Sequence, residues 1–447
     1  MNIKSRLAKR RGSSSFQIII ISFFGLILLG ACLLMLPISS QARIVTAFPD
    51  ALFTAVSATC VTGLIVKDTA TYWSQFGQCV ILSLIQIGGM GVITVGLAIM
   101  RASGRRIKLS HRSIMQDSIS APQVGGIVHL TGFILRGSAV VELTGAALLM
   151  PVFCKDFGFA KGVWYSVFHS VSAFCNAGFD LMGVRSQFSS LTSYSGNLYV
   201  NIIIMLLIIT GGIGFLVWDD VIKNKHHFKR YSLQSKVVLL TTLFLIVLPA
   251  LYFFFFEYDD MGLHDRTISS LFQSVTARTA GFNTQDLSQM EESGTTVMIF
   301  LMLIGGSPGS TAGGMKTATF AIQFLSANTV FSRRTDVQCF KRRIPEETVR
   351  TAGAILFIYL FLCFSSGIFI SRTEELPLLT CLFETGSAVG TVGLTLGITT
   401  ALSISSRNLL MVLMFFGRVG ALTLIYAALP SADSSHSRLP LEKISVG

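Results

Sequence analysis

The segment Phe53-Thr-Ala-Val-Ser-Ala-Thr-Cys-Val-Thr-Gly63-Leu64 decides the fold of this chain. It lies between two long apolar runs, yet it is too short and too polar to span a bilayer. Three later segments repeat its pattern: Phe, Ser or Thr four positions on, Ala, and then Gly followed by an apolar residue. They cover residues 168–179, 272–282 and 383–394, and the second of these three is one residue shorter between its Ala and its Gly. Four copies predict an internal repeat.

A second glycine motif follows each copy, inside the next apolar run. The four motifs are Gly88-Gly89-Met90-Gly91, Gly211-Gly212-Ile213-Gly214, Gly305-Gly306-Ser307-Pro308-Gly309 and Gly417-Arg418-Val419-Gly420. The predicted unit is therefore an apolar run, a short amphipathic piece, a glycine loop and a second apolar run. We expect four units at 16–112, 113–230, 231–345 and 346–430, between a basic N-terminal segment 1–15 and a tail 431–447.

The composition is that of a polytopic membrane protein. Of the 447 residues, 51% are hydrophobic and 13% are charged, and the mean hydropathy is +0.65. Soluble domains carry about 25% charged residues. The first apolar run is long enough to span and has no clear cleavage site, which argues against a signal peptide. The expected spans are 16–36, 78–100, 127–153, 197–218, 237–256, 295–325, 351–370 and 408–429.

The charge distribution predicts the orientation. The net charge is +12, and Lys and Arg gather in the loops after the second, fourth and sixth spans. This bias predicts that both termini are cytoplasmic, and it favours membrane topology over nucleic-acid binding. The eight cysteines include no Cys-x-x-Cys pair and lie mostly in apolar runs, so we interpret them as packed side chains rather than metal ligands or disulfides.

The repeated segments suggest a cation site. A short helix that enters from outside places its C-terminal end, with about half a negative charge, inside the membrane. A glycine loop lets the chain return and turns carbonyl oxygens inward. Rings of carbonyls replace the hydration shell of an ion in selective filters. The alternative is that each segment is only a glycine-containing helix junction. The candidate filter residues are Val61, Thr62, Gly63, Asn176, Ala177, Gly178, Thr279, Ala280, Gly281, Thr391, Val392 and Gly393.

These loops and the glycine motifs resemble those of the Trk/Ktr/HKT potassium transporters, most closely the membrane subunit of the Ktr system, over about residues 16–429. The resemblance implies an all-α membrane protein of eight transmembrane helices, in four helix–re-entrant loop–helix repeats with pseudo-fourfold symmetry around one pore. It further implies a homodimer in the cell (inner) membrane, on a cytoplasmic ring of nucleotide-binding regulatory subunits.

The resemblance also implies the transported ion. In that family a Ser at the first filter glycine goes with sodium transport, and all four positions are Gly here, which favours potassium. The residues alone predict only a monovalent cation. We expect potassium uptake with sodium as an activator, no cofactor in the chain and no enzymatic activity. The alternatives are a poorly selective sodium/potassium conductor and a non-conducting membrane sensor of the same fold.

The segment 304–316 departs from the other units. It is rich in Gly and Ser and contains Pro308, so we expect it to unwind within the membrane. Met315 stands where a phosphate-binding loop needs Gly beside Lys, which argues against a nucleotide site. The resemblance implies that this segment is the gate. The candidate gate residues are Gly305, Gly306, Ser307, Pro308, Gly309, Ser310, Thr311, Lys316 and Arg418.

Several charged residues fall inside apolar runs. Arg418 is the only charge in the last span, and at about 4 Å it would repel a cation by about 4 kcal/mol for an effective dielectric constant near 20. The alternative for Arg418 is a salt bridge to a neighbouring helix. Arg136 and Glu142 do not share a helical face, so we expect partners on other helices. His169 and Glu384 are interpreted as packing or hydrogen-bonding residues rather than ion contacts.

Overall fold

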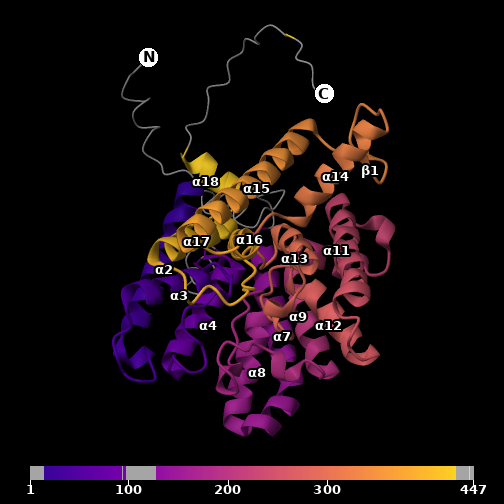
Figure 1. Cartoon of the computed structure of the whole chain (residues 1–447). Helices are drawn as coiled ribbons and strands as arrows, with labels where there is room; N and C mark the ends of the chain where they lie inside the picture. The colour runs from indigo at the N-terminus through magenta and orange to yellow at the C-terminus, as the bar shows by residue number, and fades with distance from the viewer. Residues whose placement is uncertain (1–14, 93, 97–126, 429–441, 443–447) are drawn as a thin grey trace.

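The computed structural model of the chain describes residues 15–92, 94–96, 127–428 and 442, and these residues are mostly helical (Figure 1). Residues 1–14, the basic loop expected after the second span and nearly all of the expected tail lie outside the described residues. The helices and strands are α2 (Ser15–Met35), α3 (Phe48–Thr59), α4 (Gln75–Met90), α7 (Ile127–Phe157), α8 (Phe159–Phe174), α9 (Leu198–Ile213), α10 (Phe215–Asn224), α11 (Leu233–Tyr252), η5 (Phe253–Glu257), α12 (Leu263–Thr276), α13 (Glu292–Leu303), α14 (Thr317–Phe331), β1 (Gln338–Cys339), β2 (Arg342–Arg343), α15 (Glu346–Glu374), α16 (Leu378–Gly390), α17 (Ile404–Val419) and α18 (Ala421–Ala428).

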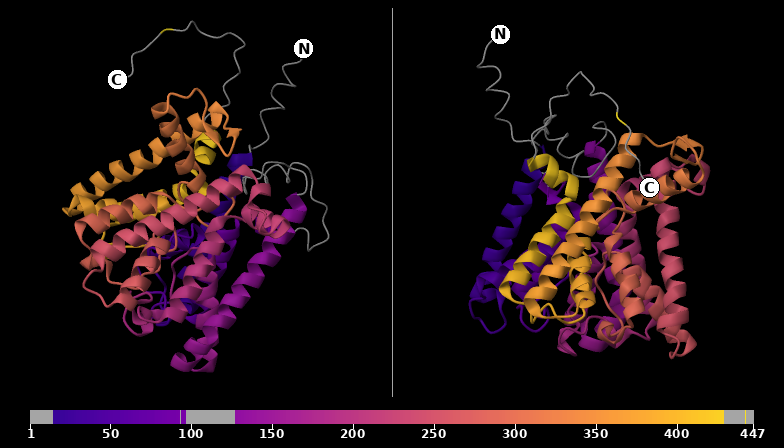
Figure 2. Two further views of the ribbon diagram at one scale, coloured as in Figure 1. Left: turned by 90° about the vertical axis from the view of Figure 1, so that its right-hand side faces the viewer. Right: turned by 45° about the horizontal axis from the view of Figure 1, so that its top comes forward.

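Four helices in the described part of the chain are long and apolar enough to cross a bilayer unaided. They are Phe16–Met35, Val128–Phe157, Leu233–Glu257 and Glu346–Glu374. Of these, α2, α11 and α15 stand at the periphery (Figure 2). Only 28 to 33% of each apolar window is buried inside the protein. Apolar exposure on this scale is typical of a membrane protein rather than of a soluble domain.

Three of the other expected spans, 78–100, 197–218 and 408–429, are each interrupted at a glycine, a break that was not expected there. α4 stops before Gly91, α9 meets α10 at Gly214 with a bend of 96°, and α17 meets α18 at Gly420. These glycines have φ of 86, 98 and 92° with ψ of 126, 140 and 138°, a backbone conformation that residues with a side chain rarely adopt. The break between α13 and α14, over residues 304–316, is confirmed as predicted.

The repeated segments form four short helices, α3, α8, α12 and α16, which pack in a cyclic order. α3 contacts α17, α8 contacts α4, α12 contacts α9, and α16 contacts α13. The shared phenylalanine anchors each helix in the core, where its burial contributes about 1.5–3 kcal/mol. All four are at most 1% exposed: Phe53, Phe168, Phe272 and Phe383. Because this shared phenylalanine is buried, the face of each short helix that carries it packs against the protein interior.

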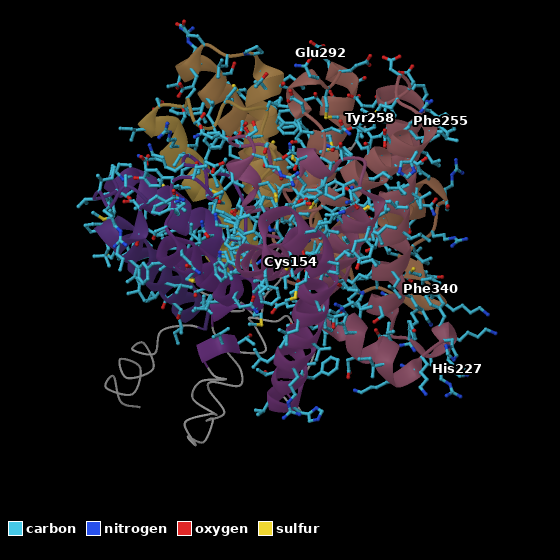
Figure 3. The ribbon with its side chains drawn as sticks, turned by 90° about the horizontal axis from the view of Figure 1, so that it is seen from below. Cys154, His227, Phe255, Tyr258, Glu292 and Phe340 are labelled. Atoms are coloured by element: carbon cyan, nitrogen blue, oxygen red, sulfur yellow. The ribbon has the colours of Figure 1, made fainter. Side chains whose placement is uncertain are left out.

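A small hairpin joins α14 to α15. β1 and β2 are antiparallel, with Gln338 opposite Arg343, and the tip residues Phe340 and Lys341 have φ of 49 and 60°. Two positive φ values in succession fit the tight turn that matches strand twist. The Phe340 ring lies 6.3 Å from that of Phe228, beside the segment that carries His227 (Figure 3). The hairpin therefore packs on the connection between α10 and α11.

Candidate functional site

Each repeated segment ends in the same unusual backbone conformation. The residue two positions before the shared glycine is left-handed, with φ between 53 and 67°. The glycines themselves have φ between 67 and 94°. A left-handed non-glycine residue is uncommon, and such strain persists mainly where surrounding structure enforces it. The left-handed residues are Val61, Asn176, Thr279 and Thr391, which are the first predicted filter residue of each loop.

The four glycines lie against one another in a closed ring. A Cβ atom on Gly63 would lie 2.5 Å from the carbonyl oxygen of Ala177, and one on Gly178 would lie 2.8 Å from that of Ala280. The same position on Gly281 meets the carbonyl of Val392, and on Gly393 it meets that of Thr62. The second, third and fourth loops each place a backbone oxygen against the glycine of the loop before them. The first loop places Thr62 O against Gly393 of the fourth, which closes the ring.

The ring contacts join eight of the twelve predicted filter residues: Thr62, Gly63, Ala177, Gly178, Ala280, Gly281, Val392 and Gly393. No side chain fits at the glycines, because backbone atoms of the next loop occupy the space. The C-terminal ends of α3, α8, α12 and α16 all lead into it, and each carries about half a negative charge. Converging negative helix ends and ordered carbonyls favour a dehydrated cation over an anion.

The Ser or Thr shared by the four copies holds the loops in place. Ser57 Oγ accepts from Gly63 N at 3.1 Å, and Ser387 Oγ accepts from Gly393 N at 3.0 Å. Ser172 Oγ instead donates to Phe179 O at 2.7 Å, and Thr276 donates to Phe282 O. The shared hydroxyl therefore fixes either the filter glycine or the residue after it.

The segment 304–316 lies directly beneath the ring. Thr311 Oγ1 donates to Phe174 O at 3.0 Å and to Asn176 Oδ1 at 3.2 Å. A Cβ atom on Gly313 would meet the side chain of Thr391, and one on Gly305 would lie 3.2 Å from Thr279 Cγ2. The loop therefore touches the first filter residue of the second, third and fourth copies.

The second glycine motifs are the docking points of this loop, a role that the sequence pattern alone did not reveal. Ser307 N donates to Gly212 O at 2.9 Å, and Thr311 N donates to Gly211 O at 3.3 Å. Gly314 N donates to Gly417 O at 3.1 Å. A sequence signal for these docking points does exist, because a glycine motif recurs near the end of the second helix of each repeat. Carbonyl groups at the end of a helix lack an intrahelical partner and can accept hydrogen bonds from the loop.

Arg418 ties the loop to α4. Its guanidinium donates to Thr311 O and Gly88 O and, at 2.8 Å, to Gly89 O. Within the described ranges these three backbone carbonyls are its hydrogen-bond partners, and none of the ion pairs found there includes Arg418. Lys316 Nζ donates to Ala312 O at 2.7 Å.

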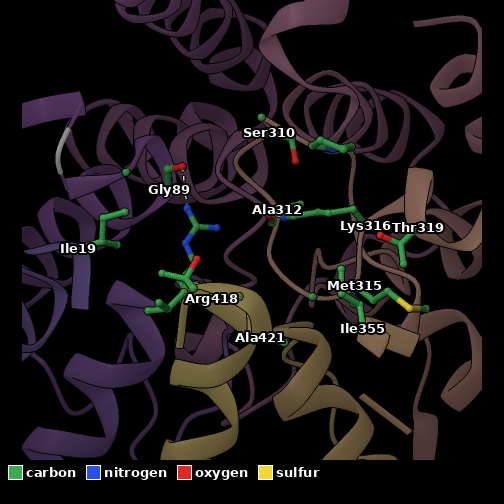
Figure 4. Close-up of a pocket in the computed structure, with 18 of the residues that line it drawn as sticks. Ile19, Gly89, Ser310, Ala312, Met315, Lys316, Thr319, Ile355, Arg418 and Ala421 are labelled. Carbon is green, nitrogen blue, oxygen red and sulfur yellow. Dashed lines mark hydrogen bonds between the residues drawn. The ribbon is translucent and has the colours of Figure 1, made fainter. Parts of the chain in front are cut away.

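Arg418 and Lys316 both face one cavity of about 320 Å³ (Figure 4). Its lining includes Gly89, Pro308, Ser310 and Ala312, and no Asp or Glu is among the described residues that line it. A guanidinium without a carboxylate in the same cavity lining opposes the approach of a cation. The arrangement thus places Arg418 next to the loop that contacts the ring of backbone carbonyls.

Three further polar or charged residues that the sequence placed within the membrane-spanning part are buried and hydrogen-bonded: Glu142, His169 and Glu384. Glu142 of α7 accepts from Gln86 Nε2 of α4 at 2.9 and 3.0 Å, which is the partner on another helix that its position predicted. Arg136 is exposed on the surface of α7. His169 and Glu384 are fully buried and hydrogen-bonded.

Comparison with known proteins agrees with this geometry. The chain is 38% identical to the potassium/sodium uptake protein NtpJ of Enterococcus hirae, covering 100% of this chain and 99% of that protein. It is 40% identical to Ktr system potassium uptake protein B of Bacillus subtilis, covering 96% of each. The solved structure of the potassium transporter TrkH from Vibrio parahaemolyticus has the same fold, with a TM-score of 0.73 at 18% identity over 94% of this chain and 86% of that one.

A family model matches nearly the whole chain. The model named TrkH, cation transport protein, matches residues 2–437. The members are ion transporters, so the chain is not an enzyme, and its apolar helices are those of a membrane protein. This protein belongs to the TrkH family of cation transport proteins.

Proposed function

We propose that this protein mediates potassium uptake through a single pathway lined by the four glycine loops. The observation that carries the proposal is the closed ring of Gly63, Gly178, Gly281 and Gly393. Carbonyl rings of this kind substitute for the hydration shell of an alkali ion. Potassium appears in the names of relatives that are 38 and 40% identical to this chain over nearly its whole length.

Within this proposal the twelve predicted filter residues form the selectivity filter and residues 304–316 with Arg418 form the gate. The four predicted units surround the filter with pseudo-fourfold symmetry. Each broken helix counts as one crossing, which gives eight crossings and places both termini in the cytoplasm. The cyclic packing of α3, α8, α12 and α16 supports this arrangement.

The proposed assembly is a homodimer in the cell membrane, gated by a cytoplasmic ring of nucleotide-binding subunits. Support comes from the relatives of Bacillus subtilis, whose names place them in a Ktr system. Sodium is proposed as an activator, and no cofactor is bound by the chain itself.

The proposal is tested by cation flux in liposomes, measured with and without the cytoplasmic regulatory subunit, and by growth of potassium-uptake-deficient cells at low potassium. Potassium-dominated flux and restored growth are expected. No flux and no growth despite good expression would indicate a non-conducting sensor. The name of the Enterococcus hirae relative includes sodium, which favours a potassium/sodium conductor as the second candidate, and sodium-dominated flux would select it.

The Arg418→Gln variant is expected to raise basal potassium flux by at least about tenfold. Gln removes the positive charge, worth up to about 4 kcal/mol against a cation nearby, and loses most of the bonds to Thr311, Gly88 and Gly89. Arg418→Lys keeps the charge but cannot bridge three carbonyls, so a smaller rise is expected. Flux is measured in liposomes without the regulatory subunit. No increase for the Gln variant would contradict the barrier.

A further inference from the structure

The residue that follows the shared phenylalanine is polar in every copy: Thr54, His169, Gln273 and Glu384. These side chains lie at one register on the four short helices, and all four are at most 1% exposed. Burying a polar group costs free energy unless it is hydrogen-bonded. The bonds that each makes therefore indicate what the position does.

In the second and fourth copies this side chain holds the same backbone amide. Leu181 N donates to His169 Nε2 at 3.3 Å, and Leu396 N donates to Glu384 Oε1 at 3.2 Å. Leu181 and Leu396 each lie three residues beyond the filter glycine of their loop. The same contact thus joins the short helix to the chain that leaves the filter, although the two side chains differ in chemistry.

Each of these side chains is itself fixed. His169 Nδ1 lies 2.7 Å from Tyr165 O, which makes Nδ1 the donor and leaves Nε2 as an acceptor. Glu384 also accepts from the Thr395 hydroxyl and, at 2.9 Å, from Thr399 Oγ1. A carboxylate that accepts three bonds is a stronger anchor than a neutral imidazole that accepts one.

The first and third copies have different contacts at this register. Thr54 Oγ1 donates to Asp50 O of its own helix at 2.9 Å. Gln273 Nε2 lies 3.4 Å from Met298 Sδ, and its Oε1 accepts no hydrogen bond from the described residues. Because the ring order is first, second, third, fourth, the two anchored loops face each other across it.

We propose that His169 and Glu384 are positioning residues for ion selectivity: from opposite sides of the ring they clamp the chain leaving the filter and so set the spacing of its carbonyls. The inference rests on the proposed function. Selectivity depends on cavity size and on how firmly the carbonyls are held. Two anchors on facing loops limit widening along one diameter, whereas the loops of the first and third copies lack this anchor.

The experiment compares removal of the anchor with its conservative replacement. Glu384→Leu and His169→Leu remove the acceptor and keep a comparable volume. Glu384→Gln retains an oxygen for Thr395 and Leu396 N, and its amide can donate to Thr399. His169→Gln likewise retains an acceptor. In the Leu variant of Glu384 the two threonine hydroxyls can still bond each other, since Thr399 Oγ1 and Thr395 Oγ1 are 3.0 Å apart, which limits damage to folding.

The readout is the potassium-to-sodium flux ratio in liposomes. We expect the ratio to fall about tenfold for Glu384→Leu, which loses a charged hydrogen-bond acceptor. We expect a fall of about fivefold for His169→Leu, which loses a neutral acceptor. The two Gln variants are expected to stay within about twofold of the parent protein. Thr54→Val and Gln273→Leu are matched controls at the same register, and they should leave the ratio unchanged.

A binding measurement covers variants that conduct poorly. Thermal unfolding of the purified protein is followed in potassium and in sodium, because a specifically bound ion raises the melting temperature. The parent protein should be stabilised more by potassium, and the Leu variants should lose this difference.

The outcomes separate the clamp from the proposed function. Unchanged ion preference in both Leu variants, or equal effects in the two controls, would overturn the clamp. An equal loss for Glu384→Gln and Glu384→Leu would assign the effect to charge and would also overturn it. A parent protein that neither conducts potassium nor is stabilised by it would refute the proposed function itself.

Discussion

Replacing Gly281 by alanine is expected to reduce potassium flux by at least about a hundredfold. A Cβ atom there would meet Val392 O and would lie 3.1 Å from Gly178 Cα and 3.4 Å from Gly393 Cα. All of these neighbours are backbone atoms in the ring, so relief requires the carbonyls to move. The backbone of Gly281 has a φ of 80°, which adds about 1–2 kcal/mol of strain for a residue with a side chain.

A control glycine with the same φ separates crowding in the ring from the cost of a side chain at positive φ. Gly158 also has a φ of 80°, but a Cβ atom on it would meet nothing within 4 Å. Gly158→Ala also places a side chain at positive φ, yet it should conduct normally. Flux and expression are measured for both variants in the same liposome assay. Normal potassium flux in Gly281→Ala, or equal losses in the two variants, would argue against a filter at the glycine ring.

The repeated pattern predicted the four short helices and the loops that follow them. Phe, Ser or Thr, Ala and Gly recur because the structure needs them at fixed places in every copy. In the first copy the ring of Phe53 anchors a short helix, Ser57 fixes the loop, and Gly63 allows close approach of the next loop. Residue requirements of this kind can be recognised in a single sequence when they occur four times.

The breaks in the second helix of each unit were not predicted in three of four cases. Apolar residues stand directly on both sides of Gly91, Gly214 and Gly420, so hydropathy does not mark the break. What breaks the helix is a single glycine with positive φ, and a glycine inside an apolar run is also compatible with close helix packing. In residues 304–316 a proline and several glycines occur together, and this segment was expected to unwind.

The partners of Arg418 also lay beyond sequence reasoning. They are carbonyls of Gly88, Gly89 and Thr311, which are more than 100 positions away along the chain. Backbone acceptors leave no signature in side-chain pattern, because every residue has a carbonyl. The glycine pairs indicated where helices end, but only the cyclic packing of the units brings those ends to one loop.

Shortening the segment 304–316, which contacts the ring, should raise potassium flux, whereas Gly281→Ala should lower it. Deleting residues 308–311 is expected to raise basal potassium flux by about a hundredfold, the equivalent of about 2.7 kcal/mol. The deletion removes the bond from Phe215 N to Gly309 O, the bonds of Thr311 to the second filter loop, and an acceptor of Arg418.

The fold outside the loop should survive this deletion, because both ends of the segment remain paired. Gly305 N donates to Met315 O at 2.7 Å, and Thr317 N donates to Gly306 O at 3.1 Å. A graded series then separates gating from damage. Thr311→Ser keeps the hydroxyl and should leave flux unchanged, whereas Thr311→Val loses two hydrogen bonds and should raise flux about tenfold. If flux is unchanged in both Thr311→Val and the deletion while protein levels are normal, the loop is not the barrier. The main barrier is then the Arg418 guanidinium or the glycine ring itself, where Gly281→Ala is expected to reduce flux by at least about a hundredfold.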